Sequence, residues 1–243
     1  MNDGPGPGGQ RFPCLALTDN NPLAMLETHP EKSGNTVDLG GRTIADWCGA
    51  LATAFGLIET ALPLLLAEIG RSVERIIPVG YEARRHLSAS YFEAPGLIYL
   101  TLHPEPLTLA EAIVHESQHG KLNLLRWFDP VLKNGHTDWA PSPVRPDLRP
   151  LHGVLMAVHA FVPVAALHLR LAELQHPLSR TAAFARRRSE VLGANAAGLA
   201  TLREHAQPTA LGRRVLDALE SLHAALADKA PQLLEDVGVE ALG

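Results

Sequence analysis

Residues 107–127, with the sequence LTLAEAIVHESQHGKLNLLRW, form the stretch that decides the fold. Thr108 and Glu111 have the spacing of a capping box, which predicts that a helix begins here and continues to about Trp127. The segment Ala110–Val114 is apolar on the side that a globular fold would bury. This pattern predicts a partly buried helix in the middle of the chain.

Residues 115–119 of this helix have the pattern His-Glu-x-x-His. Side chains four residues apart lie on one helix face, so the imidazoles of His115 and His119 can bind the same transition metal. Glu116 lies beside them, where it can act on a metal-bound water or ligand. The alternative is that both histidines are ordinary hydrogen-bonded residues and Glu116 is a solvated charge, because short motifs also arise by chance.

A small sheet is predicted before this helix. A helical Ala/Leu-rich pattern runs from Thr43 to about Ile69 and ends at Gly70. Three strand-like runs separated by Pro- and Gly-containing turns then lead to the motif: Val73–Val79, His86–Tyr91 and Leu97–Leu102.

The remainder of the chain is predicted to be mainly helical. Residues 128–149 are expected to be a long irregular stretch, and three helices are expected after it, over Pro150–Gln175, Arg180–His205 and Leu211–Ala227. The charge run Arg186–Arg188 is interpreted as a solvated helix face. The fold class is therefore α+β, with a small sheet, a motif helix that is zincin-like, and a helical C-terminal body. Residues 1–13 are predicted to be disordered, and residues 14–243 to form a single metalloenzyme domain.

A third metal ligand is sought after the motif. A further histidine six residues beyond His119, as in metzincins, is excluded because Leu125 occupies that position. The next helix has no glutamate before Glu173, which lies at its far end. It does contain His159 in an apolar setting, where an imidazole needs a partner. We favour His159 as the third ligand, with His152, two turns earlier, as the reserve choice. Such a set suits zinc or iron.

Two arginines precede that helix in the segment Val144–Pro150, and both are flanked by proline. Because a guanidinium can bind a carboxylate through two hydrogen bonds, Arg149 or Arg145 could hold an acidic cosubstrate. The alternative is that these arginines pair with nearby acidic side chains such as Asp147.

Composition narrows the classes of function. The formal net charge is -5, which gives no support for a nucleic-acid-binding protein. With only two cysteines, Cys14 and Cys48, a disulfide-stabilised secreted scaffold is disfavoured and a cytoplasmic location is expected. The N-terminal residues do not have the pattern of a signal peptide, and the most apolar stretch contains three histidines and a proline, so no membrane segment is expected.

Several segments together resemble one family. They are Ser88–Tyr91, Glu93–Gly96, the motif stretch Ala110–Asn123, the arginine-containing stretch Pro141–Pro150, and Gly153–Phe161. Over about residues 86–170 this ordered string resembles the HExxH-motif peptide-modification proteins, the α-ketoglutarate-HExxH peptide β-hydroxylases of ribosomally made, modified-peptide (RiPP) biosynthesis.

The resemblance implies an Fe(II)- and α-ketoglutarate-dependent dioxygenase that uses O2 to hydroxylate a β-carbon of a precursor peptide. It implies that His115, His119 and His159 hold the iron, and that Arg145 or Arg149 binds the cosubstrate carboxylate. Glu116 would then orient a water or a ligand. Two rival functions are a zinc metallopeptidase, with Glu116 as general base, and a non-catalytic peptide-binding module.

Overall fold

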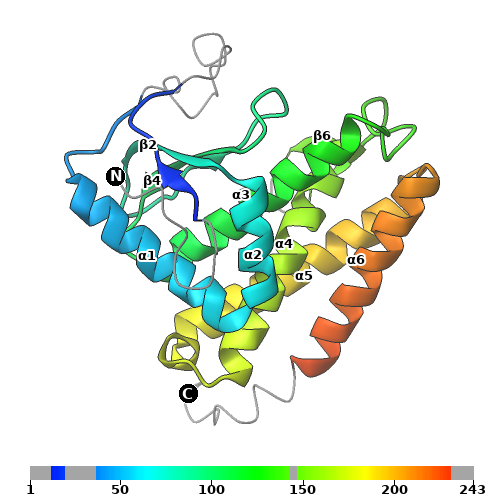
Figure 1. Ribbon diagram of the computed structural model, residues 1–243. Coiled ribbons are helices and arrows are strands. Elements are labelled where there is room, and N and C mark those ends of the chain that lie inside the picture. The colour runs from blue at the N-terminus through cyan, green and yellow to red at the C-terminus, as the bar shows by residue number, and fades with distance from the viewer. Residues whose placement is uncertain (1–11, 20–36, 143–146, 231–243) are drawn as a thin grey trace. The chain divides into compact units, whose positions relative to one another are not determined.

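The computed structural model describes residues 12–19, 37–142 and 147–230 (Figure 1). The chain divides into two compact units, one ending at Asn123 and the other beginning at Leu124. Both contain helices together with short strands, and the prediction of an α+β protein is confirmed. The single domain predicted over residues 14–243 stays a prediction, and most of the N-terminal segment expected to be disordered lies outside the described residues.

The first unit is built on a four-stranded sheet with the order β1-β2-β4-β3. The two central strands are parallel and lie side by side (Figure 1), and β3 pairs with β4 in the antiparallel direction. Parallel central strands are buried on both faces, which explains the continuous apolar runs of β2 and β4. The strands are β1 (Cys14–Leu15), β2 (Arg75–Tyr81), β3 (Ser88–Ala89) and β4 (Leu97–Leu102).

The helical segment before the sheet is divided in two, so the prediction of one continuous helix ending at Gly70 was wrong. Helix α1 (Ile44–Ala61) begins with a capping box formed by Thr43 and Asp46. Leu62 has non-helical dihedral angles, and α2 (Pro63–Ser72) starts on the proline that follows it. Proline cannot continue a helix because it has no amide hydrogen and its ring meets the preceding turn, but it is well suited to a first helical position.

The motif helix α3 (Pro106–Arg126) is present, and it ends within a residue of the predicted position. Its start differs from the prediction, because the helix begins before Thr108 and the capping box expected between Thr108 and Glu111 does not mark its N-terminus. The buried face includes Leu109, Ile113 and Leu122, which are fully buried. The helix therefore holds the motif on a rigid, packed element of the first unit.

The second unit begins with a segment that the sequence predicted to be irregular. It contains a two-stranded antiparallel ribbon, β5 (Trp139–Pro141) and β6 (Leu148–Pro150), so that prediction was wrong for these residues. Strands of three residues that end in proline give no detectable period-2 pattern. The ribbon leads directly into α4 at Leu151.

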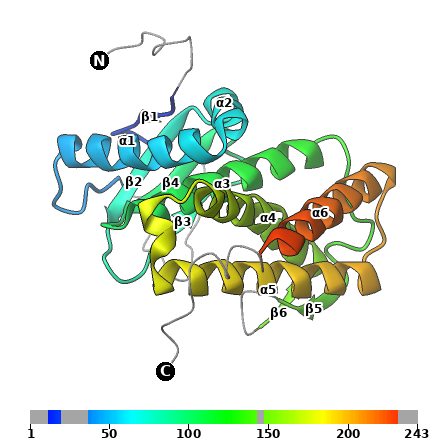
Figure 2. The ribbon, with the colours of Figure 1, turned by 90° about the horizontal axis from the view of Figure 1, so that it is seen from below.

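Three long helices form the body of the second unit, and α4 packs against both α5 and α6 (Figure 2). They are α4 (Leu151–Glu173), α5 (Ala182–His205) and α6 (Ala210–Lys229), with a short 3-10 turn, Pro177–Arg180, between the first two. Among the described residues, only α4 is long and apolar enough to cross a membrane, and 72% of its most apolar window is buried inside the structure. That burial is typical of a core helix.

The arginine run of α5 is only partly solvated. Arg186 is exposed, but Arg188 has 4% of its surface accessible. The prediction of a solvated face was therefore wrong for Arg188. The helical period explains the difference, because Arg188 follows the buried Phe184 by four residues and precedes the buried Val191 by three.

Candidate functional site

The two motif histidines lie next to each other on α3. Their ring centroids are 4.3 Å apart and the ring planes are at 76° to each other. Both residues are partly exposed, although Glu116 between them is buried. The predicted placement of His115 and His119 on one helix face is thus present, with the two imidazole rings in contact.

His119 has the protonation state that metal binding requires. Burial and the neighbouring His115 together lower its pKa to about 4, against the opposing effect of the Glu116 carboxylate. The ring is therefore neutral at pH 7, and a neutral imidazole is the form that binds metal ions. Its Nδ1 atom is buried and has no hydrogen-bond partner in the described part of the chain. A buried ring nitrogen in this condition fits a metal-binding residue.

Glu116 is held by two serines of the sheet. Ser88 Oγ donates a hydrogen bond of 2.6 Å to Oε1, and Ser90 Oγ donates one of 2.7 Å to Oε2. Ser88 lies in β3 and Ser90 follows it by two residues, so both side chains point to the same side of the extended backbone. Each carboxylate oxygen of Glu116 therefore already has a hydroxyl donor.

The Glu116 carboxylate is ionised despite its burial. Burial raises its pKa, whereas the two motif histidines lower it. Hydrogen bonds from Ser88 and Ser90 stabilise the charged form as well, and the net pKa lies below the ordinary value. The site at neutral pH is thus a buried, doubly hydrogen-bonded carboxylate beside a neutral imidazole.

The two serines are the functional residues that the analysis of single residues missed. They were noted only as part of the Ser88–Tyr91 segment and had no assigned role. The available signal was two hydroxyls at positions i and i+2 of a predicted strand, which places them on one side of the sheet edge. What the sequence lacked was the information that this side contacts Glu116.

Other histidines of the first unit form local contacts. His103 Nδ1 accepts a 3.0 Å hydrogen bond from the backbone amide of Glu105, just before α3. His86 Nδ1 lies 3.3 Å from Thr101 Oγ1, and the rings of His86 and His103 are 6.1 Å apart. These contacts connect the segment before β3 with β4 and with the residues that follow β4.

The predicted third ligand belongs to the second unit. His159 lies near the middle of α4 and is 7% exposed. His152, the reserve choice, has its ring 4.9 Å from that of His136, whose Nε2 lies 3.1 Å from Arg126. Within the described residues no group of three or more His, Cys, Asp or Glu side chains is arranged to hold a metal ion. The completion of the histidine pair by His159 stays a prediction.

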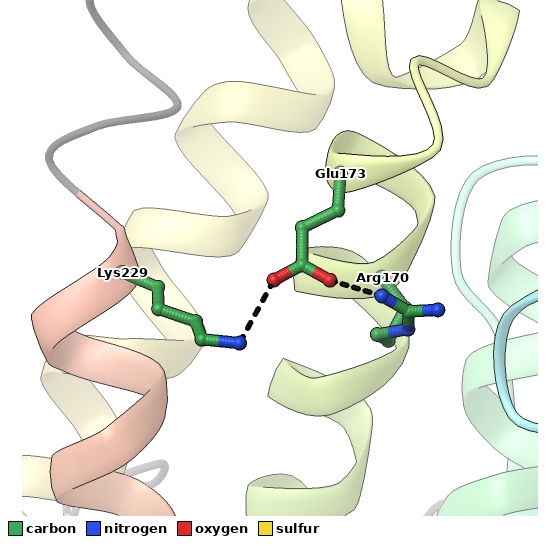
Figure 3. Close-up of polar contacts among 3 residues, drawn as sticks. All are labelled: Arg170, Glu173 and Lys229. Carbon is green, nitrogen blue, oxygen red and sulfur yellow. Dashed lines mark hydrogen bonds and ion pairs between the residues drawn. The ribbon is translucent and has the colours of Figure 1, made fainter.

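Glu173 can be set aside as a ligand. Its carboxylate is bonded by Arg170 of the same helix and by Lys229 of α6, whose Nζ lies 3.2 Å from Oε1 (Figure 3). Burial raises the pKa of Glu173, but the two cations outweigh it and the pKa lies below its ordinary value. This carboxylate serves to connect α4 with α6.

Of the two predicted cosubstrate arginines, one can be located. Arg149 lies in β6, and its Nε is 3.3 Å from Oδ2 of Asp147. Both side chains are substantially exposed, and this pairing is the alternative that the sequence left open. Arg145 lies outside the described residues.

Searches of the sequence against protein-family models and against curated proteins both find no match.

Proposed function

We propose that this chain is a non-heme Fe(II)- and 2-oxoglutarate-dependent oxygenase that hydroxylates a β-carbon of a ribosomally made precursor peptide. His115 and His119 hold the iron together with His159, and the bound iron supplies O2 activation coupled to oxidation of 2-oxoglutarate (α-ketoglutarate). We place the enzyme in the cytoplasm, where it acts on its precursor peptide, and we propose that the motif region is zincin-like, with the antiparallel strand β3 beside the motif helix.

The observation that favours this function over zinc peptidase chemistry is the environment of Glu116. A general base must present a carboxylate oxygen to the water it deprotonates, at hydrogen-bonding distance. Here both oxygens accept hydrogen bonds from Ser88 and Ser90, and the pKa is lowered rather than raised toward neutrality. A carboxylate held in this way is better suited to fixing the position and charge of the neighbouring imidazoles than to taking up a proton.

In this proposal, some residues bind the iron and others position it and the cosubstrate. The paired imidazoles supply two ligands on one rigid helix, and three protein ligands leave coordination positions for the cosubstrate and O2. The Glu116 charge, stabilised by the two serines, favours a cation beside it. A cationic side chain is needed for the distal carboxylate of 2-oxoglutarate. Arg145 and Arg149 are the sequence candidates for that role.

The experiment is metal analysis and turnover with protein purified without oxygen. With Fe(II), O2 and a precursor peptide encoded near the gene, we expect conversion of 2-oxoglutarate to succinate and addition of one oxygen atom (~16 Da) to the peptide. His119→Ala is the matched negative control. Peptide cleavage that depends on zinc would instead identify a metallopeptidase, and peptide binding without any metal would identify a binding module. Either outcome would overturn the proposal.

A further inference from the structure

The side chain of Arg188 is buried at the interface between α5 and α4. Along α5 the buried positions follow the helical period and form one stripe: Phe184, Arg188, Val191, Asn195, Leu199 and Leu202. This stripe faces α4, because the ring of Phe184 lies 5.3 Å from the ring of His168 on that helix. Arg188 is therefore the one positively charged side chain in the buried stripe of α5.

None of the acidic side chains in the described part of the chain neutralises this arginine. Among the described residues, the guanidinium of Arg188 has neither a hydrogen bond nor an ion pair, and burial alone lowers its pKa. An arginine remains protonated in proteins under any physiological condition. A buried charge without a partner is strongly unfavourable, so a fold that retains one has a use for it.

A second polar side chain in the same stripe is also unsatisfied. Asn195 is 1% exposed, and its Nδ2 has no hydrogen-bond partner in the described segments. It follows Arg188 by seven residues, which is two turns along the same face, a rise of about 10 Å. The interface between α4 and α5 thus contains one buried cation and one buried amide donor that no described residue satisfies.

We propose that Arg188 binds the carboxylate of a small ligand, and that Asn195 contributes a donor to the same site. The guanidinium is planar and matches the two oxygens of a carboxylate. Each carboxylate group of a dicarboxylate carries one negative charge, which one arginine neutralises, whereas phosphate concentrates about 1.5–2 negative charges at pH 7 on a single group and would leave excess charge beside Arg188. The first candidate ligand is 2-oxoglutarate, and in naming it the inference rests on the proposed function.

This assignment replaces Arg149 as the residue that binds the cosubstrate. The guanidinium of Arg149 already pairs with Asp147 at an exposed position, where an ion pair is weak and water competes with any ligand. Arg188 has no such partner among the described residues and is only 4% exposed, so water competes less with an anion there than at Arg149.

The test measures ligand binding by the metal-free full chain. Titration calorimetry and thermal unfolding are carried out with 2-oxoglutarate, succinate and inorganic phosphate separately. We expect the two dicarboxylates to bind the wild-type protein and to raise its Tm, and phosphate to bind at least ~10-fold more weakly. Arg188→Met should weaken dicarboxylate binding at least ~10-fold, and Arg186→Met, which removes an exposed arginine of the same helix, should leave it within about twofold.

The same variants separate a binding role from a structural one. Arg188→Met should also raise the Tm of the ligand-free protein, because it replaces an unpaired buried charge with an apolar side chain. Arg188→Lys keeps the charge but loses the bidentate geometry, so it should fold like wild type and bind dicarboxylates more weakly. If Arg188→Met fails to fold, the Lys variant and the wild-type titrations still decide the question.

Dicarboxylate binding that is unchanged in Arg188→Lys or Arg188→Met would overturn the inference. So would a wild-type protein that binds none of these anions, or one that prefers phosphate. The proposed function fails independently of this result. If Arg188-dependent carboxylate binding is found and no succinate forms with Fe(II) and peptide, the binding site stands and the oxygenase proposal falls.

Discussion

The hydroxyl of Ser88 donates a 2.6 Å hydrogen bond to Oε1 of Glu116, which lies 28 residues further along the chain. This contact joins the edge strand of the sheet to the motif helix. Because Glu116 is ionised and buried, this is a charge-assisted hydrogen bond from a half-buried hydroxyl to a buried carboxylate. The edge of the sheet thus fixes the carboxylate next to the two histidines.

We expect Ser88→Ala and Ser90→Ala each to lower the free energy of unfolding of the metal-free protein. Hydrogen bonds to buried charged groups contribute about 1.5–3 kcal/mol each, and each substitution removes one donor from Glu116. Urea denaturation measures the loss. In a Glu116→Gln background the same serine substitutions should cost less, because the charge that they stabilise is gone. Equal losses in both backgrounds would mean that the serines act independently of the carboxylate.

Contacts within one helix of the site could be predicted from the sequence, but contacts between the helix and the sheet could not. The pairing of His115 with His119 follows from the geometry of one helix, and the structure places their rings 4.3 Å apart. The contacts of Ser88 and Ser90 with Glu116 depend on which side of a two-residue strand faces the helix. Nothing local in the sequence encodes that orientation, because it follows from the packing of the sheet edge against α3.

His119→Ala is expected to abolish metal binding. Its ring is neutral at pH 7, and its removal leaves one imidazole on α3, which is too few ligands for tight binding on a single helix. Elemental analysis of the purified protein measures the bound metal, and circular dichroism verifies that the variant is folded. His103→Ala serves as the control, because the Nδ1 of His103 is occupied by a backbone amide. Retention of metal by His119→Ala would exclude the histidine pair as the metal site.

The third ligand can be identified by comparing two substitutions on α4. We expect His159→Ala to weaken metal binding by more than ~10-fold, because a ligand contributes more than the 10–100-fold typical of residues that support ligands. His152→Ala should have a smaller effect, since its ring packs against His136. Competition with a metal chelator measures both affinities. The reverse order of effects would assign the third position to His152.

The bounds of a helix or strand could be predicted where local sequence signals mark its ends. Strand β4 was predicted with the bounds it has, Leu97–Leu102, because six consecutive apolar or β-branched residues lie between clear turn signals. The break at Pro63 was missed because the apolar pattern is helical on both sides of it. Arg188 was misassigned with its neighbours, although the period connecting Phe184, Arg188 and Val191 was already visible in the sequence.

Because Glu173 connects α4 with α6, we expect the free energy of unfolding to depend on pH. The pKa of Glu173 is lowered in the folded protein relative to its ordinary value of 4.5, because Arg170 and Lys229 outweigh the effect of burial. The unfolded chain therefore binds the proton more tightly, and the stabilisation is present above pH ~4.5 and is lost as the pH falls below it. The contribution is about 1 kcal/mol, because both cations are partly exposed.

Glu173→Gln is expected to remove this contribution at pH 7 and to have little effect at pH 3. Unfolding by urea at both pH values measures the difference. Glu204→Gln is the matched control, since the Glu204 side chain is 75% exposed and its Oε1 lies 3.7 Å from Nε2 of His205. If Glu173→Gln lowers the free energy of unfolding by the same amount at both pH values, the charge of the Glu173 carboxylate does not stabilise the contact between α4 and α6.

The start of α6 is held by a close approach of backbone that leaves no room for a side chain at Gly212. A Cβ at this position would overlap the carbonyl group of Val131. That carbonyl also accepts a 3.0 Å hydrogen bond from Thr209 N, and Thr209 Oγ1 donates one of 2.6 Å to Asp129. Val131 itself has φ 65°, an unfavourable conformation for a β-branched residue. The loop is thus fixed at several points and has little freedom to move away.

Gly212→Ala is therefore expected to destabilise the protein by about 1–3 kcal/mol, the usual cost of forcing extra volume into packed structure. Gly193→Ala is the matched comparison, because Gly193 lies in the interior of α5 and a Cβ there meets nothing within 4 Å. Alanine should stabilise that helix by about 0.5–1 kcal/mol, since glycine loses more backbone freedom on folding. Urea denaturation of both variants measures the change in the free energy of unfolding, which should be a decrease for Gly212→Ala and an increase for Gly193→Ala. If Gly212→Ala is neutral or stabilising, the loop at Val131 must be able to move away from α6. The hydrogen bonds of Thr209 would then not fix the position of that loop.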